Sequence, residues 1–370
     1  MPAESARKER LLELRGGGGL LLLAGVMVLV TLAIRVPALL RSIQTPLVGD
    51  GSNVDSYGFD FTTCLVLRGP LVASGFSKDH VPALDHPRAI TGDEADELNR
   101  RLRREQHIKL LVPGDRVAGV RINGVARAYA LRLLQWHQIV NDTVGGVPIA
   151  VTYDPLCDSA VVFDRRVGDE TLAFGHSGLL YNSNLLIYDR RDDPRAESLW
   201  SQLQFRAIAG PAAAAGLRLR LVHADVVRWD EWRQRHRDTT IMAPLTEHLK
   251  SYKISYSNYY GSNLLRFPVE PLSATAAADP MAAVIALRLD GKWHALGLEH
   301  IAERAKGCRR WQTSIGGHSV TFDYQLDPPT VWTAIEPAVD DFLAIRSFRF
   351  AWHAMHPESN LATGLSAHKP

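Results

Sequence analysis

The chain has 370 residues, with 42 Lys and Arg against 40 Asp and Glu, and a formal net charge of +2 at pH 7. Its composition, 46% apolar and 22% charged, is that of a packed globular protein and excludes a disordered one. The length suffices for one large domain or two of ordinary size. The positive excess lies in residues 1–41, and the remainder gives no sign of a basic face, so we expect no nucleic-acid partner.

The N-terminus contains one long uncharged segment, residues 16–34. A helix of this length spans about 28 Å, close to the thickness of the hydrocarbon core of a bilayer. Lys and Arg are in excess on its N-terminal side, which favours a cytoplasmic N-terminus. A cleaved signal peptide and a buried core helix are the alternatives. We expect a membrane contact through a single helix, with the bulk of the chain extracytoplasmic. The expected segments are a cytoplasmic N-terminus (1–15), a transmembrane anchor (16–36) and a linker (37–58).

Two local structures come first beyond the linker. Residues 93–106 are charged and rich in helix-forming residues, which predicts a surface helix. Residues 117–130 contain two strand-like runs around Asn123 and Gly124, the pair that favours a type I′ turn. This segment therefore predicts a β-hairpin, and residues 131–140 after it predict a helix.

Turn residues, strands and one more helix follow. Residues 141–148 have the composition of a turn. The expected strands are 149–153, 160–165, 171–175 and 185–188. Residues 229–237 predict a short helix with aromatic and charged side chains. The pattern as a whole indicates a β-rich α+β fold.

Part of the chain recurs in degenerate form. The paired segments are 117–130 with 284–295, 145–151 with 316–322, and Trp232 and His236 with Trp352 and His356. This pattern predicts two related β-rich halves, which we place at residues 59–245 and 246–370. The second half has nothing like the loop at residues 154–157 after its Gly-Gly strand.

The loop at residues 154–157 is the centre of the predicted functional site. It places the carboxylate of Asp154 and the thiol of Cys157 three residues apart, between two strands. With His137 close by, these side chains would form a mixed N/O/S site for a transition metal, and His176 is a weaker fourth candidate. The alternative is structural: Cys157 is a small buried residue, Asp154 caps a turn and His137 is a satisfied core histidine.

Further polar and aromatic residues near this loop are candidates for ligand binding. They are Asn141, Asp142, Tyr153, Ser177, Arg190 and Trp200. Ser177 lies in a Gly-rich run, but its spacing departs from that of a nucleophile elbow, which disfavours a serine hydrolase. Arg190 could hold an anionic ligand or pair with Asp189 or Asp164.

Three cysteines leave at least one thiol without an intrachain partner. If a disulfide forms, we expect it between Cys64 and Cys308, which leaves Cys157 available in the central loop.

Several short strings together resemble a bacterial family known as domain of unknown function 3179. They are VPALDHP (81–87), RVAGVRINGVARAYAL (116–131), WHQIVNDTVGGVPIAVTY (136–153), PLCDSAVVFDRRV (155–167), the FG-x-SG run (174–178), NLLIYDRR (184–191) and LWSQ (199–202). The family loop usually reads C-P-L-C, which implies a metal or thiol-redox site. Here Asp154 replaces the first cysteine, and His176 stands where the family has an apolar residue. The resemblance also implies that the membrane is a bacterial inner membrane.

Two functions remain open. The first is a metal- or thiol-dependent enzyme or redox protein centred on Cys157, Asp154 and His137. The second is a non-catalytic protein in which the same loop shapes a pocket for a small molecule or a protein partner. Convergence of the three side chains at metal-ligand distances would favour the first. A buried Cys157, a His137 bonded to the backbone and an apolar cleft between the halves would favour the second.

Overall fold

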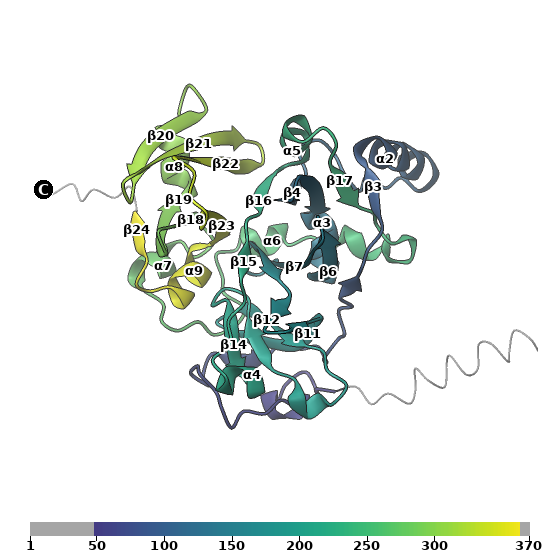
Figure 1. The fold of residues 1–370 in the computed structure, drawn as a ribbon, viewed down its shortest axis with the longest axis vertical. Coiled ribbons are helices and arrows are strands. Elements are labelled where there is room, and N and C mark those ends of the chain that lie inside the picture. The colour runs from purple at the N-terminus through teal and green to yellow at the C-terminus, as the bar shows by residue number, and fades with distance from the viewer. Residues whose placement is uncertain (1–47, 363–370) are drawn as a thin grey trace, which may run out of the picture. The chain divides into compact units, whose positions relative to one another are not determined.

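A computed structural model describes residues 48–362 of the chain (Figure 1). These residues belong to one compact unit. The predicted segments 1–15 and 16–36 lie outside the described residues, as does the first part of the linker 37–58. Within the described range, no helix is both long enough and apolar enough to cross a membrane.

The described residues form a β-rich α+β fold with several sheets, as the sequence predicts. One five-stranded sheet has the order β16-β4-β5-β17-β3, in which β17 runs parallel to β5 and the other neighbours are antiparallel. Its strands are β3 (Ala89–Thr91), β4 (Arg116–Ile122), β5 (Val125–Ala130), β16 (Asp225–Arg228) and β17 (Thr240–Met242). The helices next to them in the chain are α2 (Gly92–Gln106), α3 (Leu131–His137) and α5 (Trp229–Arg235).

A four-stranded sheet later in the chain repeats this arrangement. Its order is β23-β18-β19-β24, and its last strand is again parallel to the neighbour. The strands are β18 (Ala283–Leu289), β19 (Lys292–Gly297), β23 (Leu343–Phe348) and β24 (Asn360–Ala362), and the helices are α8 (Leu298–Arg304) and α9 (Arg349–Met355). In each sheet, a helix follows the hairpin and another precedes the parallel strand, so the two regions share one topology. We call them the first and second repeats.

Each repeat also contains a strand meander after its hairpin helix. In the first repeat the meander is part of the sheet β15-β8-β7-β6-β2, and in the second it is the three-stranded sheet β20-β21-β22. The strands are β2 (Leu84–Asp85), β6 (Ile139–Val144), β7 (Val147–Asp154), β8 (Ser159–Asp164), β15 (Leu221–Val222), β20 (Arg310–Ile315), β21 (His318–Leu326) and β22 (Pro329–Glu336). Both repeats close their first hairpins with two residues of positive φ, which is the geometry of a type I′ turn. These turns are Asn123-Gly124 (φ +49° and +83°) and Asp290-Gly291 (φ +48° and +75°).

The Trp and His pairs noticed in the sequence occupy equivalent places in the two repeats. Each tryptophan lies on the helix before the parallel strand, and the histidine four residues later packs against it. The ring centroids are 4.1 Å apart in the tilted pair Trp232–His236 and 4.2 Å apart in the stacked pair Trp352–His356. Each indole N–H donates to a hydroxyl seven residues later, over 2.9 Å in both cases. The same side chains therefore end the same helix in both repeats.

An insertion distinguishes the first repeat from the second. Between β8 and β16 the chain builds most of a five-stranded sheet of order β1-β11-β12-β13-β14, whereas β22 leads directly to β23 in the second repeat. Its strands are β1 (Leu71–Ala73), β11 (Phe174–Tyr181), β12 (Asn184–Asp189), β13 (Leu199–Ser201) and β14 (Arg206–Ala209), followed by α4 (Pro211–Ala214). A two-stranded ribbon of β9 (Arg166–Val167) and β10 (Glu170–Thr171) precedes it.

The core of the insertion extends into the second repeat. Cys157, Trp200, Phe348 and Trp352 belong to one buried apolar cluster. The segment between the repeats contains the short helices η4 (Ser251–Lys253), α6 (Ser257–Tyr260) and α7 (Ala274–Ala278). Figure 1 shows the second repeat, in light green and yellow, on the opposite side of the described unit from α2.

Local predictions were mostly confirmed, with three exceptions: the end of one helix, one turn, and the strand predicted over 171–175, which is interrupted at residues 172–173 between β10 and β11. The predicted surface helix is α2, whose N-cap Thr91 forms a capping box with Glu94. The helix predicted over 131–140 ends at His137, and the turn predicted over 141–148 is mostly strand, with only Gly145 and Gly146 at its turn. Asn141 and Asp142 are turn formers in isolation, but their side chains here bond to neighbouring strands, and this tertiary pairing outweighs local propensity.

The expected disulfide is absent. Cys64, Cys157 and Cys308 are all free thiols. Cys64 pairs through its backbone with β14 beside the insertion, whereas Cys308 is exposed in the connection between α8 and β20 of the second repeat.

Candidate functional site

The loop between β7 and β8 holds Asp154 in a closed set of hydrogen bonds. One carboxylate oxygen accepts from the Leu156 N–H at 2.8 Å, and the other accepts from the Leu185 N–H at 2.8 Å and from Asn184 Nδ2 at 2.9 Å. Burial raises the pKa of Asp154, although these donors oppose the shift. The carboxylate thus ties its own loop to β12.

Cys157 is fully buried in the same loop. Its Sγ lies 3.4 Å from the carbonyl oxygen of Ser183, and its backbone carbonyl accepts from the Phe348 N–H at 2.7 Å. Burial, together with the nearby Asp154, raises the pKa of the Cys157 thiol well above its usual value. Because the thiolate is the nucleophile and the metal ligand, a protonated buried thiol is a poor candidate for either role.

His137 does not join the loop. Its Nδ1 donates to the carbonyl oxygen of Pro82 at 3.0 Å, and its Nε2 lies 2.9 Å from the hydroxyl of Tyr252. That hydroxyl accepts from the Leu245 N–H, so its own proton points to Nε2. Burial lowers the pKa of His137 to about 4, which keeps the ring neutral with both nitrogens engaged.

The expected three-ligand arrangement of His137, Asp154 and Cys157 is therefore not formed. Within residues 48–362, no group of three or more His, Cys, Asp or Glu side chains is placed to hold a metal ion. His176 is held in the same way: its Nδ1 accepts from the Gly178 N–H at 3.2 Å, and its Nε2 lies 3.0 Å from Gln138 Oε1. Burial also lowers the pKa of His176 to about 4.

Asn141 and Asp142 link strands rather than face a pocket. The Asn141 side chain exchanges two hydrogen bonds with the backbone of Phe174, at 2.9 and 3.0 Å, and so joins β6 to β11. Asp142 accepts from Arg127 at 2.9 Å and from the hydroxyl of Tyr129 at 2.7 Å. Both residues are buried.

The remaining candidates also have structural partners. Ser177 donates to the carbonyl oxygen of Leu186 at 2.5 Å, so it is not poised as a nucleophile. Arg190 pairs with Asp85, not with Asp189 or Asp164 as expected. Asp189 instead accepts from the indole of Trp200 at 2.9 Å and pairs with Arg191.

Tyr153 leads to a buried charge cluster that the sequence reasoning missed. Its hydroxyl donates to Asp158 at 2.8 Å. Asp158 also accepts two hydrogen bonds from Arg116, both at 2.8 Å, and one from Arg346 at 2.8 Å. Burial alone would raise the pKa of Asp158, but the two guanidinium groups outweigh it and hold that pKa well below its usual range. Arg116 lies on β4 and Arg346 on β23, so one carboxylate joins the two repeats.

A cavity of about 320 Å³ opens beside this cluster. Arg116 lies in its wall, and the second repeat contributes Pro328, from the loop between β21 and β22. The segment between the repeats contributes Lys253 and Ser255, whose side chains are exposed. The cavity therefore reaches the surface where the two repeats meet. The other lining residues are Gly114, Asp115, Leu131, Arg132, Gln135, Tyr252, Ile254 and Ser257. We call it the inter-repeat cavity.

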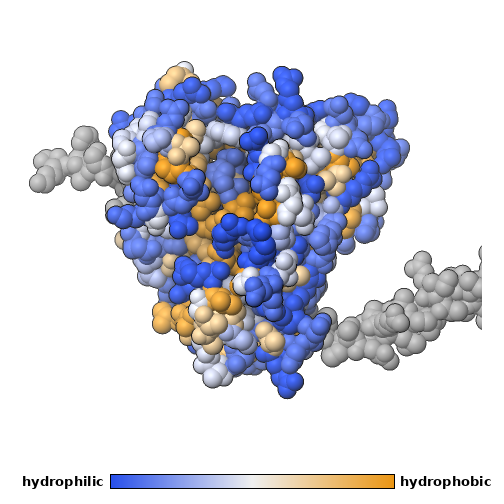
Figure 2. Space-filling view, in the orientation of Figure 1, coloured by the Kyte–Doolittle hydropathy of each residue, from blue (hydrophilic) through white to orange (hydrophobic). Residues whose placement is uncertain are grey.

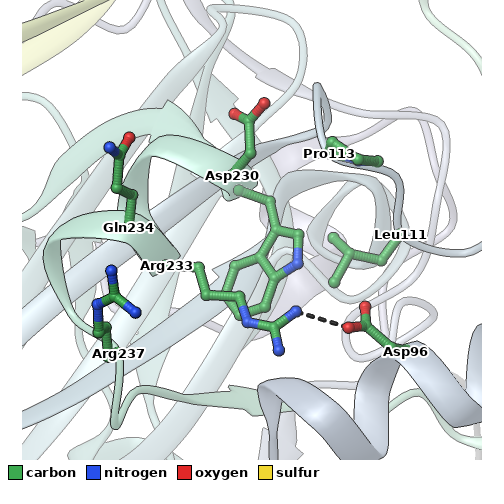
Figure 3. Close-up of a pocket in the computed structure, with 8 residues that line it drawn as sticks. Asp96, Leu111, Pro113, Asp230, Arg233, Gln234 and Arg237 are labelled. Atoms are coloured by element: carbon green, nitrogen blue, oxygen red, sulfur yellow. Dashed lines mark hydrogen bonds and ion pairs between the residues drawn. The ribbon is translucent and has the colours of Figure 1, made fainter.

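A larger cavity of about 520 Å³ lies between α5 and α2 (Figure 3). Arg233 crosses it and bonds to Asp96 at 2.6 Å and to Asp93. A third cavity, of about 660 Å³, is lined by Arg228 and Arg235, which pair with Asp230 and Glu231 respectively. In both places, acidic neighbours compensate these arginines.

Comparison with known proteins agrees with the resemblance noted in the sequence. No curated protein and no solved structure matches the chain. A family model described as protein of unknown function (DUF3179) matches residues 78–332, a range that contains the central loop, the insertion and the hairpins of both repeats. The chain belongs to the DUF3179 family.

Proposed function

We propose that this protein is a non-catalytic binding protein whose ligand site is the inter-repeat cavity. One observation carries the proposal: the side chains expected to react are buried and hydrogen-bonded within the fold, whereas the cavity beside them is polar, charged and open. Asp154, Cys157 and His137 are each at most 2% exposed. Their neighbour Asp158 instead holds Arg116 in the cavity wall.

The cavity has the position and size of a ligand site. Ligand pockets commonly lie where two structural units meet and have volumes of about 300–1,000 Å³. Both repeats and the segment between them contribute residues to this one. Its lining is charged and hydroxylic, so it differs from the apolar cleft that the sequence led us to expect for a binding protein. A polar wall favours a polar ligand.

The composition of the N-terminal segment indicates on which side of a membrane this binding would take place. Residues 16–36 have the length and composition of a membrane anchor, and Lys and Arg are in excess before them. We propose that the anchor holds the binding domain on the extracytoplasmic side of a bacterial inner membrane. There the inter-repeat cavity would be accessible to small molecules without their crossing the membrane.

Thermal unfolding of the full-length chain in detergent tests this proposal. A panel of neutral, cationic and anionic small molecules is added to the parent, to Gln135→Trp and to Gln234→Trp. Gln135 lines the inter-repeat cavity and Gln234 lines the cavity of Figure 3, so the two variants carry the same substitution in different places. A ligand that raises the unfolding temperature of the parent and of Gln234→Trp, but not of Gln135→Trp, supports the proposal. If no ligand shows this pattern, the cavity is not a binding site.

A metal- or thiol-dependent site at Asp154 and Cys157 is the second candidate. Its support is that Asp154 and Cys157 lie three positions apart in one short loop and are both buried there. Elemental analysis of the purified chain and of Cys157→Ala tests it. Stoichiometric metal in the parent that is lost in the folded variant would favour this candidate over a binding protein.

A further inference from the structure

The buried cluster beside the inter-repeat cavity has more positive than negative groups. Two guanidinium groups, of Arg116 and Arg346, share the single carboxylate of Asp158. Their side chains are 16%, 11% and 3% exposed respectively, so little water screens them. The other groups that bond here are neutral: the hydroxyl of Tyr153 bonds to Asp158 and lies 3.3 Å from the hydroxyl of Tyr260, and the carbonyl oxygen of Pro329 accepts from Arg346. The cluster therefore retains one uncompensated positive charge.

The mouth of the cavity adds a second positive charge. Arg132 and Asp115 line it together and form an ion pair at 3.1 Å, so they cancel. Lys253 lines it as well, and no ion pair in residues 48–362 involves this lysine. The charged groups of the wall and of the buried cluster thus sum to about two positive charges. The other two cavities carry less charge. In the cavity of Figure 3, Asp96 and Asp230 balance Arg233 and Arg237 in number. The cavity of about 660 Å³ has three arginines against Asp230 and Glu231, and so one excess positive charge.

Neutral hydrogen-bonding groups surround the same space. Ser255 and Ser257 lie at its mouth with their hydroxyl oxygens 2.9 Å apart, and Gln135 presents an amide from α3. Hydroxyl, amide, guanidinium and ammonium groups can all donate to the oxygens of an anion. Donors on several sides of one space suit a compact anion whose oxygen atoms point in several directions.

Resting on the proposed binding function, we propose that the ligand of the inter-repeat cavity carries a dianionic phosphate group, as free phosphate or a phosphomonoester. A phosphate group of this kind has a charge of about −1.5 to −2 at pH 7, and its dianionic form matches the charge of the site. A carboxylate or a phosphodiester carries a single negative charge and leaves one positive charge uncompensated. A volume of about 320 Å³ also leaves room for a small organic group beside the phosphate.

Calorimetric titration of the full-length chain in detergent with inorganic phosphate and with glycerol phosphate tests the ligand class. Acetate is the monoanionic control. We expect saturable one-to-one binding of at least one phosphate compound and an affinity at least tenfold weaker for acetate. Lys253→Gln should weaken phosphate binding about tenfold, whereas Lys250→Gln, an exposed lysine of the same segment outside the cavity, should not.

The outcomes separate this inference from the proposed function. Equal weakening by Lys253→Gln and Lys250→Gln would show general charge attraction and overturn the inference, as would the absence of phosphate binding. If phosphate fails but another ligand binds the parent and not Gln135→Trp, the cavity is a binding site for a different chemistry. If nothing binds in a manner that Gln135→Trp removes, the proposed function fails as well.

Discussion

The two repeats build the same sheet but use one equivalent loop in opposite ways. In the first repeat, the loop between β7 and β8 holds Asp154, Cys157 and Asp158, all of which are buried. In the second repeat, the loop between β21 and β22 holds Asp327 and Pro328, and Leu326 before them is 68% exposed. The first loop is covered by β12, by the segment between the repeats and by β23.

This difference shows where the site comes from. The hairpins, the meander and the Trp–His pair recur in both repeats, so they serve the fold. The insertion and the segment between the repeats occur once. Both cover the first loop, and the segment between the repeats also lines the cavity. Arg346 links the first loop to the start of β22, because it bonds both to Asp158 and to the carbonyl oxygen of Pro329. The recurring elements form the scaffold, and the segments that occur once distinguish one loop from the other.

The largest expected effect is in the buried loop. Asp158→Asn removes the carboxylate that two buried arginines share, and it should lower the free energy of unfolding by about 3–5 kcal/mol. Asparagine tolerates the positive φ of +46° at this position, so the change tests charge and not backbone strain. Asp327→Asn, in the exposed loop of the second repeat, is the control and should change that free energy by about 0.5 kcal/mol or less. Urea denaturation measures both, and similar losses in the two variants would contradict the contrast between the loops.

The next effect is the pH dependence of the first repeat and its insertion. The pKa values of His137 and His176 are lowered to about 4 in the folded chain, below the usual value of 6.5, so the folded state binds fewer protons than the unfolded state. Stability is therefore complete above about pH 6.5 and falls by about 1.4 kcal/mol per pH unit for each histidine as the pH drops towards 4. Urea denaturation at pH 7, 6 and 5 measures this slope. His137→Gln should make the slope shallower by about the share of one histidine, and an unchanged slope would show that His137 is not buried in its neutral form.

A smaller and equal effect is expected at the recurring motif. Trp232→Phe and Trp352→Phe each remove one indole N–H that donates to a buried hydroxyl, of Thr239 and Ser359 respectively. Each should lower the free energy of unfolding by about 0.5–1.5 kcal/mol, because one hydrogen bond is lost while each hydroxyl still donates to a backbone carbonyl. Chemical denaturation of the two variants side by side measures the difference. A large inequality would mean that the motif does not serve the same purpose in both repeats.

The smallest effect concerns the reactivity of the thiols. Cys157 is buried and Cys308 is exposed, so brief alkylation of the native chain should modify Cys308 and leave Cys157 intact. Mass spectrometry of the digested chain identifies the modified residues, and alkylation in denaturant is the control that labels all three cysteines. Rapid labelling of Cys157 in the native chain would show that its loop opens, and it would support a thiol-dependent function.

Much of the fold follows from local sequence patterns. Asn123-Gly124 and Asp290-Gly291 predicted their hairpin turns because these pairs tolerate positive φ. The charged segment at 93–106 predicted α2. The end of α3 was not predictable in this way, because Asn141 becomes a strand residue through bonds to Phe174, 33 positions away. The division at residues 59–245 and 246–370 stays a prediction.

For the candidate site, tertiary contacts decided more than local sequence patterns did. The sequence by itself determined the recurrence of the repeats, the position of the central loop and the types of its side chains, because these depend on residues close together in the chain. Only the tertiary structure decided that His137 stays apart from Cys157 and that Asp158 joins Arg116 and Arg346, which lie 42 and 188 positions away. A buried ion pair depends on which groups, distant in the sequence, come together in a low-dielectric interior. Short-range sequence patterns do not predict such pairs.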